Sequence, residues 1–169
     1  MSGSDWFFKL GEPLELAECL QVRDYLHGLG LRDELPVEAV SDWESARRAI
    51  DTPDWDRRWW DAEQAERQRL QQVAGEAQGH AAVLRGLSDA IERVGEAIHQ
   101  AAQVASARRG PADAALVRAA AGAASEALYL SELARLAGAG ERHPFALKRA
   151  LFASGRWPLG IVNTRFYLF

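Results

Sequence analysis

Along most of the chain, apolar residues recur every three or four positions, the spacing that buries one side of an α-helix. Proline and glycine residues interrupt this pattern and mark where helices begin and end. The predicted helices cover about residues 13–28, 36–51, 53–105, 111–138 and 144–154. The pattern therefore predicts a chain that is helical over most of its length.

The first two helices have distinct expected faces. The helix over residues 13–28 is expected to bury an apolar face that includes Leu16, Leu20 and Tyr25. The next is expected to begin near Pro36, with Trp43 among its buried residues.

Residues 53–105 form the longest helical segment, and the pattern leaves open whether it is one helix or two helices that meet near Gly75 or Gly79. From Leu70 to Ala105 apolar residues keep a heptad spacing, which predicts a long helix in a bundle or a coiled coil. His80 falls on the apolar seam of this repeat, where we expect it to be buried. A helix with this seam can also pair with a second copy, so a structural coiled-coil homodimer is one interpretation.

The end of the chain differs from the rest. The segments "WPLGIV" and "RFYLF" alternate like strands and flank the dipeptide Asn163–Thr164, which predicts a β-hairpin at about residues 157–169. Both faces of this hairpin are apolar, so either helices cover both or one face is an interface. The predicted fold is all-α: a single domain over residues 1–169, with about five or six bundled helices and a small C-terminal β-hairpin.

Composition adds limits to this picture. The chain is 48% hydrophobic and 26% charged, as in an ordinary globular protein. Cys19 is the only cysteine, which excludes an intrachain disulfide. No signal peptide is recognisable, and no apolar stretch approaches the roughly 18 residues of a membrane span. We therefore expect a bacterial cytoplasmic protein without membrane association.

The net charge of −4 hides an asymmetry. Residues 1–66 carry a balance of −9, whereas residues 67–169 carry +5. Two explanations stay open: the halves attract each other within one fold, or an acidic face is presented to a basic partner. By the first explanation, Arg156 and Arg165 of the ending are expected to meet the acidic N-terminal half.

Motifs that carry chemistry are missing. Neither a nucleophile elbow nor a phosphate-binding loop occurs. Glu96 and His99 form one E-x-x-H pair, but a di-iron bundle needs two, and the heptad turns this pair away from the seam. The sequence predicts no metal and no cofactor, and the acidic net charge argues against nucleic-acid binding. Whether the protein is an enzyme stays open, although the missing motifs argue against it.

The ending also carries a resemblance. The segment "HPFALKRALFASGRWPLGIVNTRFYLF" resembles the end of small, mostly helical bacterial proteins with the pattern "HPF…K…LF…G.WP.GI…..FY.F". These are immunity proteins that protect against secreted bacterial toxins. The resemblance covers about 27 residues of the chain and includes no catalytic residue. It implies a binding protein without enzymatic activity.

The leading interpretation is a protein-binding module, an immunity-type inhibitor that occludes a toxin. A surplus of tryptophan and acidic residues at the start of the long helical segment suits a basic toxin domain as partner. The expected contact residues are Asp54, Trp55, Asp56, Trp59, Trp60 and Asp61. Because adjacent helical residues point about 100° apart, only one of Trp59 and Trp60 is expected in the core.

A second interpretation is a small-ligand-binding or enzymatic bundle with an internal pocket near His80. The polar residues expected to line this pocket are Glu76, His80, Tyr129 and Glu132. It requires His80 to be enclosed together with a second inward-facing polar side chain.

Overall fold

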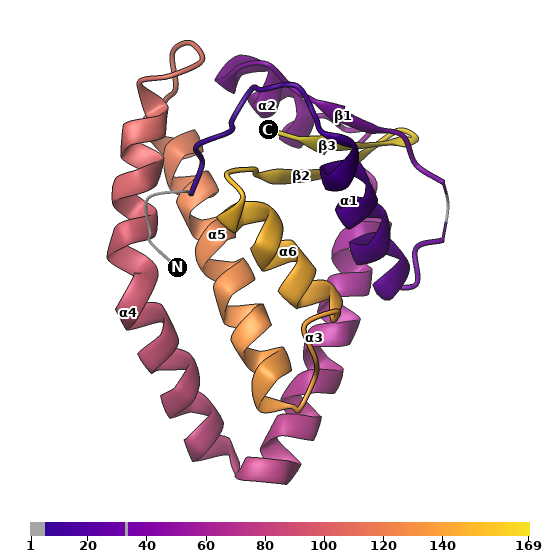
Figure 1. The fold of residues 1–169 in the computed structure, drawn as a ribbon, viewed down its shortest axis with the longest axis vertical. Coiled ribbons are helices and arrows are strands. Elements are labelled where there is room, and N and C mark those ends of the chain that lie inside the picture. Colours follow the sequence, from indigo (N-terminus) through magenta and orange to yellow (C-terminus); the bar gives the residue numbers. More distant parts are fainter. Residues whose placement is uncertain (1–5, 33) are drawn as a thin grey trace.

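The structure, a computed structural model, describes residues 6–32 and 34–169, and helices packed around α5 make up most of it (Figure 1). Its helices are α1 (Leu16–Gly28), α2 (Trp43–Ile50), α3 (Arg57–Gln78), α4 (His80–Ser106), α5 (Ala114–Leu136) and α6 (Pro144–Ala153). Its strands are β1 (Val37–Ala39), β2 (Pro158–Val162) and β3 (Arg165–Leu168). The predicted helical bundle with a small C-terminal β-hairpin is confirmed.

Helix α5 is the central element, and α3, α4 and α6 all pack against it. Its alanines at 120, 124 and 127 are fully buried, and their short side chains let neighbouring helices approach closely. In Figure 1, α3 and α4 meet at the lower end of the molecule and diverge upward, with α5 and α6 between them. The small sheet and α2 lie at the opposite end.

The predicted unbroken heptad helix is wrong, because the chain reverses at Gly79. Gly79 has φ +81°, a conformation that a residue with a Cβ rarely adopts. After the turn the buried stripe restarts in a different phase, so that His80 is exposed and Leu84 is 65% exposed. From Leu87 to Ala105 the expected seam does face inward, against α5.

The helix predicted from Pro36 is also wrong at its start. Residues 37–39 form β1, which pairs in parallel with β3, and α2 begins only at Trp43. Asp42 caps α2, since its side chain accepts a hydrogen bond from the backbone N–H of Ser45 at 2.7 Å. Backbone pairing with a strand about 130 residues away outweighs the local helical pattern.

The hairpin has the expected turn, with Asn163 in the left-handed region at φ 55°. Strand β3 lies between β1 and β2, so the hairpin belongs to a three-stranded sheet. Phe166 packs with residues of α1, α3 and α6, whereas Phe169 packs edge-on against Trp43 of α2 at 5.0 Å between ring centroids. Helices therefore cover both sides of the hairpin, and its apolar residues close the core.

Helix α1 buries only part of the expected face. Tyr25 is buried as expected, whereas Leu16 and Leu20 are exposed and Glu18 and Val22 are buried in their place. The reason is the buried guanidinium of Arg156, which forms an ion pair with Glu18 and so holds this side of α1 toward the interior. Apolar spacing alone does not show this preference.

Candidate interaction surface

The start of α3 is fixed to the edge of the sheet. Trp55 forms an isolated antiparallel bridge with Val162 of β2, and the backbone N–H of Asp56 donates to the carbonyl of Ile161 at 2.8 Å. The Asp56 side chain then caps α3 by accepting from the backbone N–H of Arg58 at 2.9 Å. This short segment, with a strand on one side and a capped helix on the other, is held at both ends.

The three tryptophans of this segment differ in how deeply they are buried. Trp59 is 6% exposed, and its indole N–H donates to the hydroxyl of Tyr25 at 2.6 Å. Trp55 is half-buried, donates to the carbonyl of Leu159 at 3.2 Å and packs edge-on against Trp59. Trp60 points outward and is 38% exposed. Of the adjacent pair, Trp59 belongs to the core and Trp60 to the surface, as the helical geometry predicts.

The acidic residues of the segment differ as well. Asp56 is half-buried and pairs with Arg58, whose hydrogen bond holds the pKa of this carboxyl below its ordinary value. Asp61 is exposed and forms an ion pair with Arg57 at 3.2 Å, while Asp54 is exposed at the surface. The outward-facing members of the expected set are therefore Asp54, Trp60 and Asp61, which we call the Trp60 surface.

A buried polar network supports this surface from beneath. The hydroxyl of Tyr25 donates to one oxygen of Glu63, and the ammonium of Lys148 donates to the other at 2.7 Å. Burial, and then the neighbouring Glu63 carboxylate, raise the pKa of Tyr25 well above its ordinary value. Lys148 also lies over the ring of Trp59, at 5.1 Å from its centroid. The network joins α1, α3 and α6 and holds Trp59 in place.

A second buried ion pair joins α1 to the segment that precedes β2. The guanidinium of Arg156 donates to both carboxylate oxygens of Glu18, at 2.9 and 3.0 Å. It also donates to the carbonyls of Lys9, Glu12 and Pro13. Burial alone would raise the pKa of Glu18, but the hydrogen bonds from Arg156, the hydrogen bond from the backbone of Glu15 and the charges of Arg156 and Lys9 together outweigh it and leave this pKa lowered.

Arg156 was expected to meet the acidic N-terminal half, as it does at Glu18, but the burial of Glu63 and Lys148 was not predicted, although spacing gives a signal for both. Glu63 lies four residues after Trp59 and seven before Leu70, on the same buried stripe of α3. Lys148 lies three residues after Phe145 on the buried stripe of α6. A charged residue inside an apolar stripe indicates a buried ion pair, since an unpaired charge there is costly.

The structure does not enclose His80 together with the other residues expected to line a pocket there. His80 and Glu76 are both exposed, and the structure places Tyr129 half-buried against α3. Glu132 is bound by both guanidinium hydrogen bonds of Arg135, one turn further along α5. The expected burial of His80 is wrong because the turn at residue 79 places it at the exposed start of α4.

From Leu87 to Ala105, the seam expected to mediate a homodimer is occupied within the chain. Ile98, Ala102 and Ala105 of α4 are almost fully buried in a cluster with residues of α5. Because this face already has a partner, it is not available to pair with a second copy.

Comparison of the chain with protein-family models, with curated proteins and with solved structures finds no match. The resemblance of residues 143–169 to immunity proteins therefore stays a prediction. Among residues 6–32 and 34–169, no helix combines the length and apolar character needed to cross a bilayer. In the same described residues, no three His, Cys, Asp or Glu side chains gather as a metal site would require.

Proposed function

We propose that the chain is a protein-binding module, an immunity-type inhibitor that occludes a bacterial toxin in the cytoplasm. The observation that carries this proposal is Trp60, exposed on a helix whose neighbouring tryptophan is buried. Exposed tryptophans on fixed backbones are frequent hot spots of protein interfaces. The resemblance of residues 143–169 to immunity proteins supports the same interpretation.

Rigidity beneath Trp60 favours tight binding. Trp59 is held by Tyr25 and packs edge-on against Phe166 at 5.7 Å, while the first residues of α3 are bonded to β2. When a partner docks on a surface that is already fixed, the protein that carries this surface loses little conformational entropy. The Trp60 surface is well suited to rigid docking for this reason.

Electrostatics favour a basic partner. Asp54 and Asp61 lie on the surface near Trp60 in the sequence, and the pair that Asp61 makes with Arg57 is exposed. Exposed ion pairs contribute little stability, so a cationic side chain of a partner can take the place of Arg57 at small cost. The proposed mechanism is steric and electrostatic masking of the toxin, without turnover.

A growth assay tests this function. Each product encoded by the genes that flank this one is expressed in a bacterial host, alone and together with this chain. The proposal predicts that one flanking product, or its C-terminal domain, stops growth, and that co-expression of this chain restores it. Co-purification of the two proteins would show that protection comes from binding.

Trp60→Ala and Leu84→Ala form a matched pair in this assay. Both remove an exposed apolar side chain from a helix, but Leu84 lies on α4, away from the Trp60 surface. Protection should be lost in the first variant and kept in the second. If no flanking product is toxic, or if this chain protects against none, the proposed function is wrong.

A further inference from the structure

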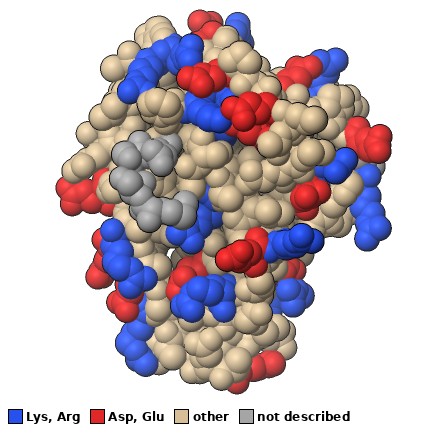
Figure 2. Space-filling model, in the orientation of Figure 1, with Lys and Arg blue, Asp and Glu red and all other residues tan. Residues whose placement is uncertain are grey.

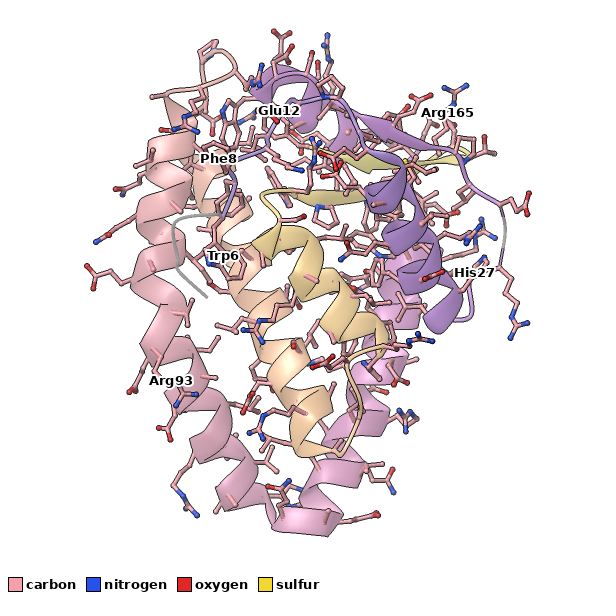
Figure 3. The ribbon with its side chains drawn as sticks, in the orientation of Figure 1. Trp6, Phe8, Glu12, His27, Arg93 and Arg165 are labelled. Carbon is pink, nitrogen blue, oxygen red and sulfur yellow. The ribbon has the colours of Figure 1, made fainter. Side chains whose placement is uncertain are left out.

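A groove between the end of α4 and the start of α5 lies outside the Trp60 surface. Its volume is about 400 Å³, within the range of roughly 300–1,000 Å³ typical of small-molecule sites. Figure 3 shows α4 and α5 side by side, with Arg93 labelled on α4 ahead of the groove in the chain. Because none of the residues that line this groove belongs to α3, it goes beyond the proposed function.

The floor of the groove is apolar. Ala102 of α4 and Ala121 of α5 are almost fully buried where the two helices pack, and Val117 is half-buried beside them. Ala112 and Ala114, which come from the connection and the first turn of α5, line the groove as well. These short side chains leave room between the helices and offer methyl groups to the apolar part of a ligand.

Polar side chains line the groove from both helices. His99 and Gln103 are four residues apart on α4, so their side chains are neighbours on its surface. Arg118 lines the groove from α5. All three residues are exposed, and within residues 6–32 and 34–169 no hydrogen bond or ion pair occupies their side chains. Their N–H groups are therefore available to a ligand.

The charge of Arg118 has no counterpart in the groove, because none of the described residues that line it carries a carboxylate. The acidic residues closest to it along the chain are engaged with other groups. Asp113 caps α5 and forms an ion pair with Arg47 of α2. Glu96 accepts a hydrogen bond from the side chain of Gln100 at 3.1 Å. The lining residues together therefore carry a net positive charge.

We propose that this groove binds a small phosphate monoester, whose phosphate pairs with Arg118 and accepts hydrogen bonds from His99 and Gln103, and whose apolar body lies on the alanine floor. The guanidinium group is a planar fork that matches the oxygens of a phosphate. A phosphate monoester carries about −1.5 to −2 charges at neutral pH and has three oxygens that accept hydrogen bonds, so it can bind donors from both helices at once. A carboxylate has a single charge and two oxygens, which favours the phosphate.

An NMR titration tests the site with butyl phosphate and butyrate, two probes that share a short alkyl chain and differ in the head group. Sodium chloride holds the ionic strength constant and should by itself leave the spectrum unchanged. The proposal predicts saturable shifts of the backbone amides of Ala102, Gln103 and Val117 with butyl phosphate, and weaker binding of butyrate. Equal affinity for the two probes would contradict the assignment of a phosphate.

Three variants make the titration specific. Arg118→Gln should weaken the binding of butyl phosphate about tenfold, the loss expected for one charged hydrogen-bonding partner, and His99→Ala should weaken it about threefold. Arg93→Gln makes the same charge change as Arg118→Gln at a residue that does not line the groove, and it should leave binding unchanged. Circular dichroism checks that each variant is folded.

Two further results would overturn the proposal. One is that none of the groove amides shifts saturably with butyl phosphate. The other is that Arg93→Gln weakens binding as much as Arg118→Gln, which would mean adventitious ion binding at surface arginines only. The titration uses no protein partner, so its outcome is independent of the proposed function.

Discussion

Among residues 6–32 and 34–169, four charged side chains lie in the interior: Glu18, Glu63, Lys148 and Arg156. A buried charge is tolerated only when a partner and further hydrogen bonds replace its water. Here each carboxylate has a cationic partner, and Arg156 also binds three backbone carbonyls. These residues fix how α1, α3 and α6 meet, so they determine the platform beneath Trp60.

Lys148→Met should lower the free energy of unfolding by about 3–5 kcal/mol, because it leaves the carboxylate of Glu63 buried without its cation. Urea unfolding followed by circular dichroism measures this loss. The double variant Glu63→Leu with Lys148→Met should lose less than the single variant, since no unpaired charge remains.

An exposed ion pair provides the control for this substitution. Asp61→Asn removes the partner of Arg57 at the surface and should change stability by less than about 1 kcal/mol. Equal losses in Lys148→Met and Asp61→Asn would contradict a structural role for the buried pair.

The Glu18–Arg156 pair should make stability depend on pH. The pKa of Glu18 is lowered in the folded protein from its ordinary value of 4.5, so the unfolded chain binds the proton more readily. The stabilisation is therefore fully present above pH 4.5 and is lost as the pH falls through the lowered pKa. Urea midpoints at about pH 7 and about pH 3 measure this change.

Glu18→Gln separates this contribution from that of other carboxyl groups. The variant should be less stable at neutral pH and should lose less stability on acidification than the unsubstituted protein. Parallel losses in the two proteins would show that Glu18 is not the group responsible.

Among the elements, those with strong local signals were predictable from the sequence. Helix α5 follows from its regular alanines, although it begins at Ala114, after its cap at Asp113, and not at residue 111. The hairpin follows from Asn163 and the alternating residues around it. The strand β1 was not predictable, because its pairing partner lies about 130 residues away. The sequence left the turn at Gly79 open, because apolar residues on both sides happened to keep a heptad spacing.

The candidate site was predictable only in part, for a related reason. Helical geometry separates Trp59 from Trp60, so the exposed tryptophan could be anticipated as one of the two. Which of them is buried depends on Tyr25 and Phe166, which come from α1 and β3. Contacts between segments that are distant in the sequence therefore determine which tryptophan is buried, and no local sequence pattern reveals these contacts.

The close approach of β2 to α3 depends on a single glycine. Gly160 has φ +114°, and a Cβ there would lie 2.6 Å from the indole nitrogen of Trp55 and 2.8 Å from the ring of Trp59. Gly160→Ala should therefore lower the free energy of unfolding by at least about 2 kcal/mol, through backbone strain and overpacking. Thermal or urea unfolding measures the loss.

Gly122→Ala is the matched control on α5, where an added Cβ meets open space. It should raise stability by about 0.5–1 kcal/mol, the usual advantage of alanine over glycine within a helix. A small or absent loss in Gly160→Ala would mean that β2 and α3 are not packed as described.

On the scale of the whole molecule, the charge asymmetry of the sequence is largely resolved within the fold. Five ion pairs among the described residues join acidic residues of the first 66 positions to lysine or arginine residues beyond them. They are Glu12 with Arg109, Glu18 with Arg156, Glu38 with Arg165, Glu63 with Lys148 and Glu66 with Arg69. Figure 2 shows positive and negative side chains interspersed over one face. On this face, an acidic contact with a partner would therefore have to be local.

Substitutions of the two adjacent tryptophans should distinguish a role in stability from a role in binding. Trp59→Ala should lower the free energy of unfolding by about 3–5 kcal/mol, because it empties a buried position. Trp60→Ala removes a side chain with no such role and should change stability by no more than about 0.5 kcal/mol. Urea unfolding of both variants checks the assignment. A loss from Trp60→Ala as large as that from Trp59→Ala would place Trp60 in the core.

The most direct measurement is the affinity of the folded Trp60→Ala variant for the toxic product identified in the growth assay, determined by calorimetry beside Leu84→Ala. If the Trp60 surface binds the toxin, Trp60→Ala should weaken binding roughly 30-fold or more, equivalent to about 2 kcal/mol, and Leu84→Ala should bind like the unsubstituted protein. Unchanged affinity in Trp60→Ala would contradict the account.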